Sequence, residues 1–157
     1  MNRVGVGIDV HRFAAGRKLI LGGVEIPHPR GLEGHSDADA VAHAIADALL
    51  GAAALGDIGR YYPPSDVKLK NMDSMIIVRE CADRVRSAGG RIQNVDAMIV
   101  AEQPRLAPYI EAMRETLARH MGVSLKQVSV KATTSEHMGF TGREEGIVVV
   151  AIASIEL

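Results

Sequence analysis

Near its C-terminus the chain reads Ile147-Val148-Val149-Val150-Ala151-Ile152-Ala153, an apolar run without a polar interruption. β-Branched residues favour strands, and a strand that is apolar at every position is typical of a sheet covered on both faces. Strands precede and follow helices in a mixed order, which predicts an α+β fold with a mixed β-sheet. Two sources of cover for the second face stay open: the chain's own helices, or a neighbouring subunit.

Periodicity and turn residues predict the other elements. We expect about four main strands plus a small hairpin, with helices packed on one face, in a single domain over residues 1–157. The expected strands are 3–11, 92–101, 128–134 and 147–153, and the hairpin is 18–26 with its turn at Gly22-Gly23. The expected helices run from 38 to about 55, from 73 to 89 and from 108 to 122, and 56–66 is expected to be a loop.

Composition narrows the class of protein. A hydrophobic content of 47% supports a real core, while 18 Lys+Arg against 19 Asp+Glu and only 3% aromatic residues argue against a nucleic-acid partner. Cys81 is the only cysteine, so neither a disulfide nor a cysteine zinc cluster is expected, and its helical context predicts a packing role. A predicted strand starts within three residues of Met1 and no apolar run could span a bilayer, which predicts a cytoplasmic protein with no membrane partner.

The clearest chemical signal is Asp9 and His11 in Gly7-Ile8-Asp9-Val10-His11. Side chains two apart on a strand point to the same side, so both residues project together from a face that Gly5 and Gly7 leave uncrowded. An isolated Asp-x-His is more often structural, but His43 offers a third ligand. Three ligands with an open position are typical of catalytic zinc.

His43 lies one turn into the helix expected from residue 38. Ser36 or Asp37 is expected to cap that helix, and Asp39, His43 and Asp47 share one face at i, i+4 spacing. A carboxylate commonly orients a ligating imidazole, so either Asp39 or Asp47 is the predicted partner of His43.

A third chemical stretch runs from residue 131 to residue 146. The hydroxyls of Thr133, Thr134 and Ser135 at a strand end, followed by glycines, predict a phosphate cradle with Arg143 or Lys131 as charge partner. Glu136 beside the cradle would suit Mg²⁺. The alternative is an ordinary hairpin before the last strand. Neither a dinucleotide fingerprint nor a P-loop is present.

Several of these segments together resemble the 2-C-methyl-D-erythritol 2,4-cyclodiphosphate synthase family. The matching segments are 7–13, His35-Ser36-Asp37 with His43, 49–59, 131–134 and 140–146. They occur in family order over nearly the whole chain.

The resemblance implies a homotrimer with active sites between adjacent subunits, in the non-mevalonate isoprenoid pathway. The implied reaction is that of a metal-dependent phosphorus–oxygen lyase: the 2-phosphate of 4-diphosphocytidyl-2-C-methyl-D-erythritol 2-phosphate attacks the β-phosphate, giving the 2,4-cyclodiphosphate and CMP. The implied cofactors are one Zn²⁺ per subunit on Asp9, His11 and His43, and Mg²⁺ or Mn²⁺ on Glu136.

The resemblance also assigns substrate contacts. His35 and Thr134 would stabilise the transition state, and Asp9, His11 and Ser36 would lie against the substrate. The methylerythritol pocket would comprise Asp57, Ile58, Gly59, Tyr62, Pro63, Pro64, Ser65 and Asp66. The cytidine diphosphate would lie against Ala101, Glu102, Gln103, Pro104, Arg105, Leu106, Ala107, Thr133, Thr134, Ser135 and Glu136, with Phe140 and Arg143 nearby. Tyr62, Pro64 and Arg105 stand where Phe, Asp and Lys are familiar in the family.

Two other functions stay open. A metal-dependent phosphohydrolase acting on a nucleotide diphosphate would use the same ligands but give a linear product with oxygen from solvent. A non-catalytic trimer that binds nucleotides or isoprenoid diphosphates would show no turnover.

Overall fold

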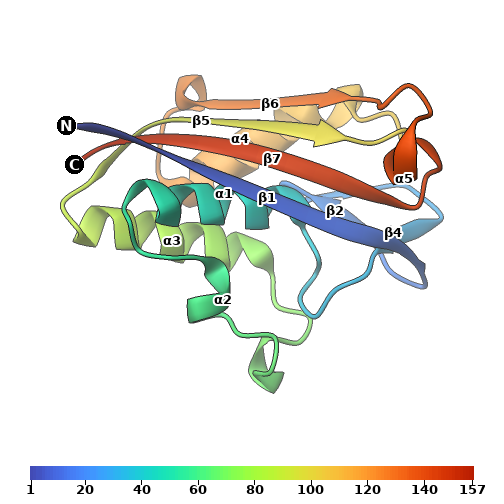
Figure 1. The fold of residues 1–157 in the computed structure, drawn as a ribbon, viewed down its shortest axis with the longest axis horizontal. Helices are drawn as coiled ribbons and strands as arrows, with labels where there is room; N and C mark the ends of the chain where they lie inside the picture. The colour runs from blue at the N-terminus through green and yellow to red at the C-terminus, as the bar shows by residue number, and fades with distance from the viewer.

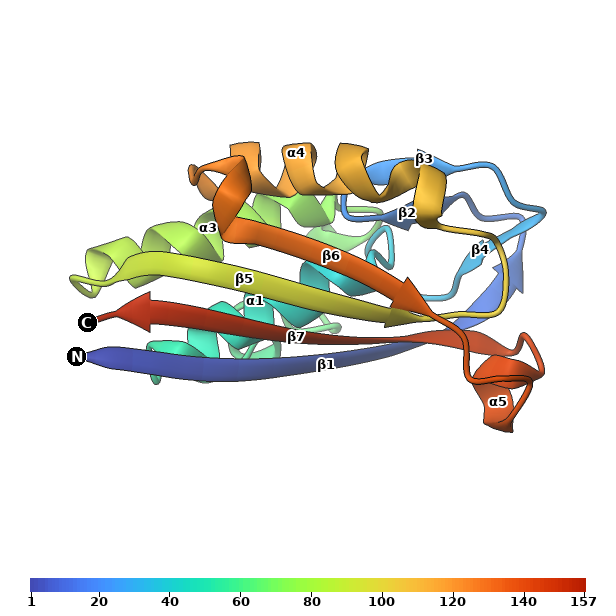
Figure 2. The same cartoon turned by 90° about the horizontal axis from the view of Figure 1, so that it is seen from above.

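The computed structural model describes all residues from Met1 to Leu157. Its centre is a five-stranded sheet in the order β4-β1-β7-β5-β6, whose long strands run side by side (Figures 1 and 2). The strands are β1 (Asn2–Ala15), β4 (Arg30–Leu32), β5 (Arg91–Val100), β6 (Val128–Thr133) and β7 (Gly146–Glu156). Only β5 and β6 pair in parallel. The predicted α+β class and mixed sheet are confirmed.

Some predicted boundaries differ from the structure. Strand β1 extends four residues beyond the predicted end, to pair with β4, which was not predicted because three residues carry no readable alternation. The hairpin of β2 (Leu19–Leu21) and β3 (Val24–Ile26) forms as expected. The segment predicted to be a loop contains a short helix, α2 (Ile58–Tyr61).

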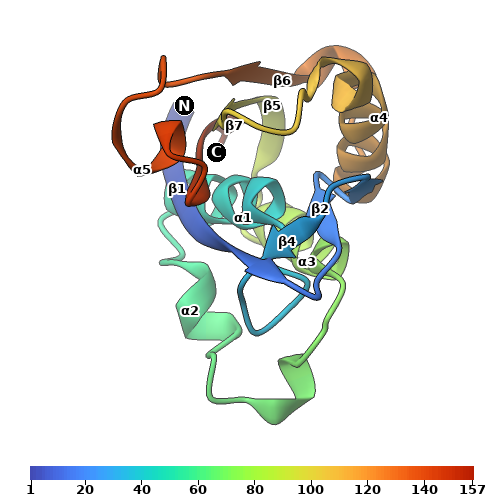
Figure 3. The same ribbon diagram turned by 90° about the vertical axis from the view of Figure 1, so that its right-hand side faces the viewer.

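The main helices are α1 (Ala40–Ala52), α3 (Ser74–Ser87) and α4 (Ile110–Met121), and they lie on one side of the sheet (Figure 3). The remaining helical elements are short: η1 (Val67–Leu69), η2 (Ala107–Tyr109), η3 (Leu125–Gln127) and α5 (Gly139–Gly142). The core between helices and sheet is aliphatic, and Cys81 is fully buried in it, which confirms its packing role. No helix combines the length and apolarity needed to cross a membrane.

Two glycines of β1 set how closely α1 approaches the sheet. A Cβ on Gly5 would lie 2.1 Å from the carbonyl oxygen of Ala48, and one on Gly7 would lie 1.9 Å from that of Ala44. Because neither glycine has a side chain, the backbone of α1 can pack closely against the face of β1 that carries Asp9 and His11. The contact places His43, on α1, beside both residues.

The other face of the sheet is apolar along β1 and β7, and no helix covers it. In β7, Ile147 and Val149 on the helix side are fully buried, while Ile152 on the opposite side is 48% exposed. Strand β1 continues this surface with exposed Val4, Val6, Ile8 and Val10. The alternative that the chain's own three helices cover both faces of the last strand is therefore wrong, because all three pack on the same face.

Candidate functional site

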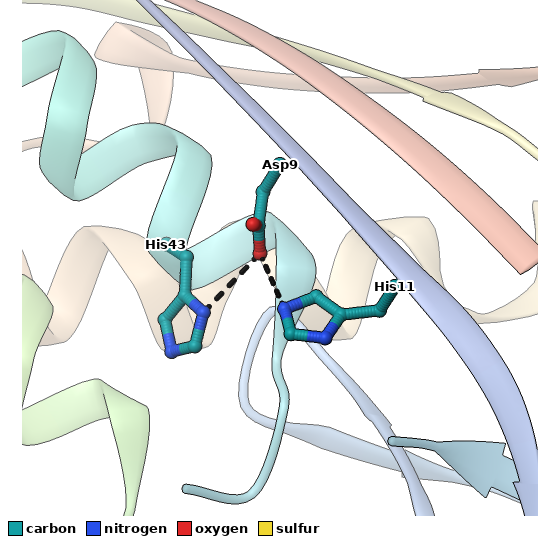
Figure 4. A group of neighbouring side chains, drawn as sticks. All are labelled: Asp9, His11 and His43. Atoms are coloured by element: carbon teal, nitrogen blue, oxygen red, sulfur yellow. Dashed lines mark hydrogen bonds and ion pairs between the residues drawn. The ribbon is translucent and has the colours of Figure 1, made fainter. Parts of the chain in front are cut away.

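Asp9, His11 and His43 converge as the strand spacing predicted (Figure 4). Asp9 Oδ2 lies 2.8 Å from His11 Nε2 and 3.2 Å from His43 Nδ1. One ligand atom from each side chain lies within 4.8 Å of the others. One carboxylate and two imidazoles in this arrangement form a possible metal-binding triad.

The partners of His11 orient its free lone pair toward the triad. His11 Nδ1 lies 2.6 Å from the carbonyl oxygen of Glu33, which can only accept, so Nδ1 carries the hydrogen. His11 Nε2 is then unprotonated in the neutral ring. This atom is buried and has no hydrogen-bond partner. It lies close to Asp9 Oδ2, but the geometry of the two groups is not that of a hydrogen bond. An orphaned buried nitrogen directed at a carboxylate fits a metal ligand.

His43 is oriented by a serine and an aspartate from outside its helix. The Ser74 hydroxyl donates to Asp37 Oδ1, and the Ser74 N–H donates to Asp37 Oδ2 at 3.0 Å. With its hydrogen so used, Ser74 Oγ accepts from His43 Nε2 at 2.9 Å. His43 therefore presents an unprotonated Nδ1 to the triad. Ser36 Oγ lies 3.3 Å from the same Nε2.

The prediction that Asp39 or Asp47 orients His43 is wrong. Asp39 is fully buried and is itself the N-cap of α1, a role predicted for Ser36 or Asp37. Its carboxylate accepts N–H groups of Gly22 and Gly23 in the hairpin, as well as that of Ala42. Asp47 accepts the N–H of Ile58 and so holds the start of α2. Both carboxylates have backbone partners, which i, i+4 spacing does not reveal.

The charges of the triad stabilise its carboxylate. Burial alone would raise the pKa of Asp9, but its interactions with His11 and His43 outweigh burial and lower that pKa to about 2. Burial lowers the pKa of His11, and the contact with Asp9 more than reverses this, so its pKa is raised. Asp9 is therefore ionised at neutral pH, as a metal ligand must be.

The triad opens into a cavity of about 220 Å³. Six residues that were predicted to contact the substrate also line this cavity: His35, Ser36, Ile58, Gly59, Tyr62 and Pro64. His35 Nε2 donates to the carbonyl oxygen of Asp66 at 3.0 Å, and the Tyr62 hydroxyl donates to Glu80 on α3. Four predicted residues are not in its wall: Asp57, Pro63, Ser65 and Asp66. Two of these have capping roles, Asp57 for α2 and Asp66 for η1.

The residues predicted for cytidine diphosphate form a separate pocket of about 270 Å³ at the ends of β5 and β6. Its lining includes Ala101, Glu102, Pro104, Arg105, Leu106, Ala107, Thr133 and Thr134. Gln103, Ser135 and Glu136 lie outside this lining. The two pockets share no lining residue. One chain therefore does not bring the metal triad and the cytidine residues together.

The predicted charge partners of the phosphate cradle are already paired. Lys131 Nζ lies 2.5 Å from Asp96 Oδ2, and Arg143 Nη2 lies 3.0 Å from Glu145 Oε2. Phe140 lies with Arg12, Arg30 and Glu145 in a third hollow next to β1. Ser74 and the carbonyl of Glu33, which orient His43 and His11, were not predicted from the sequence. A hydroxyl directly after the capping Asp73 was the one available signal for Ser74.

An α+β fold with a possible metal-binding Asp-His-His triad beside a cavity indicates an enzyme of the metal-dependent class, and comparison with known proteins identifies the family. The YgbB family model matches residues 2–156, so the chain belongs to the YgbB family. A relative from Moorella thermoacetica, a 2-C-methyl-D-erythritol 2,4-cyclodiphosphate synthase, is 61% identical over 150 residues, covering 96% of this chain and 92% of its own. A synthase of the same name from Syntrophomonas wolfei is 56% identical, covering 98% of both chains.

Solved structures agree with this assignment. The bifunctional IspDF of Campylobacter jejuni superposes with a TM-score of 0.95 at 41% identity, over 99% of this chain and 42% of that one. A 2C-methyl-D-erythritol-2,4-cyclodiphosphate synthase in its CDP-bound form gives a TM-score of 0.89 at 32% identity, over 98% of this chain and 100% of that one. The resemblance inferred from the motifs is confirmed, and the chain is an enzyme, a lyase.

Proposed function

We propose that the chain converts 4-diphosphocytidyl-2-C-methyl-D-erythritol 2-phosphate into 2-C-methyl-D-erythritol 2,4-cyclodiphosphate and CMP. The observation that carries the proposal is the convergence of Asp9, His11 and His43 on one side of a cavity that also contains His35 and Ser36. The cyclodiphosphate synthases among its relatives, and a neighbour solved with CDP, support the nucleotide substrate.

The triad fits Zn²⁺. His11 Nε2 and His43 Nδ1 both have lone pairs free, and the Asp9 carboxylate between them is ionised. Glu136 is exposed and offers one carboxylate, which suits Mg²⁺ or Mn²⁺ that also takes oxygens from substrate phosphates. The chemistry these cations supply when bound is Lewis-acid withdrawal of charge from the diphosphate.

The residues of the chain need to position the substrate more than to activate it. The 2-phosphate has a second pKa of about 6, so it is mostly dianionic at neutral pH and can attack without a protein base. Thr134 would donate a hydrogen bond to the phosphates as charge develops on the CMP leaving group. His35, whose Nε2 hydrogen is directed at the Asp66 carbonyl, would donate to them from Nδ1 with both ring nitrogens protonated. The cavity next to the triad would hold the methylerythritol, so that the 2-phosphate reacts as a neighbouring group.

We propose that the active unit is a homotrimer with shared sites. The apolar outer face of β1 and β7, with Val4, Val6, Ile8 and Ile152 exposed, requires cover that the chain itself does not supply. The metal cavity and the cytidine pocket share no lining residue within one chain, so a site that needs both would draw on two chains.

The test is to incubate the protein with the cytidyl phosphate substrate, Zn²⁺ and Mg²⁺ in ¹⁸O-water, and to analyse the products by mass. We expect CMP and a cyclic diphosphate without ¹⁸O. A linear product containing ¹⁸O would identify a phosphohydrolase instead. Binding of the substrate without turnover would identify a non-catalytic binding protein.

A further inference from the structure

The turn that carries Thr134 and Glu136 has an unfavourable backbone. Glu136 has φ 53° and His137 has φ 61°, both in the left-handed region. Residues with a Cβ occupy this region at a steric cost, and two in succession persist only where the surrounding structure holds them. The turn therefore needs a partner that favours this conformation.

Glu102 is that partner. Its Oε1 accepts the N–H groups of Ser135 and His137, each at 3.1 Å, and lies 3.4 Å from the hydroxyl oxygen of Ser135. Its Oε2 lies 3.6 Å from His137 Nδ1. N–H groups of a left-handed turn form a concavity that favours an anion, and here the anion is a carboxylate of the chain itself. The hydrogen bonds from His137 and Ser135 lower the pKa of Glu102.

The parallel pairing of β5 and β6 explains this contact. Parallel neighbours end at the same edge of a sheet, and the N–H of Ala101 still bonds to the carbonyl of Thr133 at 3.0 Å. Glu102, one residue later, therefore faces the turn that follows Thr133. Its side chain is only 6% exposed, although Glu136 on the same turn is exposed. The Glu102 carboxylate thus faces the turn and has little surface left for a ligand.

We propose that Glu102 is a positioning residue that holds the turn 134–137, so that Thr134 and Glu136 are presented together to the substrate phosphates and their cation. The two side chains already meet, with Thr134 Oγ1 3.4 Å from Glu136 Oε1. Glu102 also lies in the wall of the cytidine pocket, so it links that wall to the turn. The functional part of this inference rests on the proposed roles of Thr134 and Glu136.

The test compares Glu102→Ala, Glu102→Gln and a control, Glu115→Ala, which removes an exposed carboxylate from α4. Two quantities are measured: the Mg²⁺ concentration for half-maximal activity, and hydrogen exchange of the His137 amide by NMR without substrate. For Glu102→Ala we expect about a tenfold increase in the Mg²⁺ requirement with bound zinc unchanged, and faster exchange of the amide. Glu102→Gln keeps an acceptor oxygen and should show smaller changes in both. Glu115→Ala should match the wild type.

A second variant separates positioning from substrate contact. Glycine adopts the left-handed region without steric cost, so adding His137→Gly to Glu102→Ala should recover part of the lost Mg²⁺ response. If Glu102→Ala raises only the KM for substrate, while the Mg²⁺ response and His137 exchange stay at wild-type values, Glu102 contacts the nucleotide and the inference is wrong. If the wild type releases no CMP, the proposed function fails, and the amide exchange still decides whether Glu102 holds the turn.

Discussion

Ser74 Oγ lies 2.9 Å from Nε2 of His43, a residue 31 positions earlier in the chain, and Ser74 in turn donates to Asp37. This chain of contacts fixes which nitrogen of His43 is protonated. Ser74 belongs to the first turn of α3, and Asp37 precedes α1. The start of α3 therefore orients a ligand that the start of α1 supplies.

Replacing Ser74 by Ala should weaken zinc binding by about tenfold or more, because His43 loses the acceptor that holds its tautomer. The measurement is competition for Zn²⁺ with a chelator of known affinity. Ser129→Ala on β6 removes a half-buried hydroxyl far from the triad in sequence and serves as the control. Equal zinc affinity in both variants would show that Ser74 does not orient His43.

His43→Ala should abolish both bound zinc and cyclisation while leaving the fold intact. One of three ligands is lost, whereas the buried face of α1 consists of other residues, among them Ile45 and Leu49. Zinc content, turnover and the circular dichroism spectrum are measured on the same preparation. Retained zinc with normal turnover would show that His43 is not a zinc ligand.

The pair of Asp9 and His11 could be predicted from the sequence because its geometry is local. Strand alternation alone places Asp9 and His11 on one side, and His43 adds a third ligand from a single helix. The roles of Asp39 and Ser74 could not be predicted, since they depend on packing between distant elements. Asp39 accepts hydrogen bonds from the N–H groups of Gly22 and Gly23 in the hairpin, and helical periodicity does not predict such a partner.

The strands of the sheet also divide into those that the sequence predicts and those that it does not. The long strands could be predicted from their apolar pattern, but three-residue β4 could not, because its pairing with Phe13–Ala15 depends on the path of β1. An uninterrupted apolar run such as that of β7 indicated cover on both faces. The apolar run did not indicate which face the chain's own helices cover, because that depends on the side of the sheet on which they pack.

Gly7→Ala should destabilise the protein by about 2 kcal/mol or more, because the new Cβ would overlap the backbone of α1. That Cβ would lie 1.9 Å from the carbonyl oxygen of Ala44, one residue from His43 in the chain. We also expect weaker zinc binding, since α1 carries His43. The free energy of unfolding in urea is the first measurement, and zinc affinity is the second.

Gly51→Ala is the matched control for Gly7. Gly51 lies in α1, and a Cβ there would meet no atom closer than 3.8 Å. Alanine favours a helix over glycine, so this variant should gain about 0.5 to 1 kcal/mol. Similar losses of stability in both variants would contradict the close approach of α1 to β1.

The metal-free protein should lose stability as the pH falls from about 4 toward 2. The pKa of Asp9 is lowered from 3.8 to about 2, so its ionised form stabilises the folded state above pH 4, and protonation removes that contribution below. The loss is about 2 kcal/mol at most. Unfolding free energies of the wild type and Asp9→Asn are compared across this range. The variant should have a shallower slope, and identical slopes would show that Asp9 does not carry this dependence.

Mixing two inactive variants tests the shared site most directly. His11→Ala removes a metal ligand and Thr134→Val removes the cradle hydroxyl, so each variant alone should be inactive. In a mixed trimer about one site in three would pair an intact triad with an intact cradle from the neighbouring chain. The measurement is cyclic diphosphate formed by mixed trimers, whose composition is verified by native mass spectrometry. We expect recovered activity, whereas verified mixed trimers without activity would place each site within one chain and contradict the shared site.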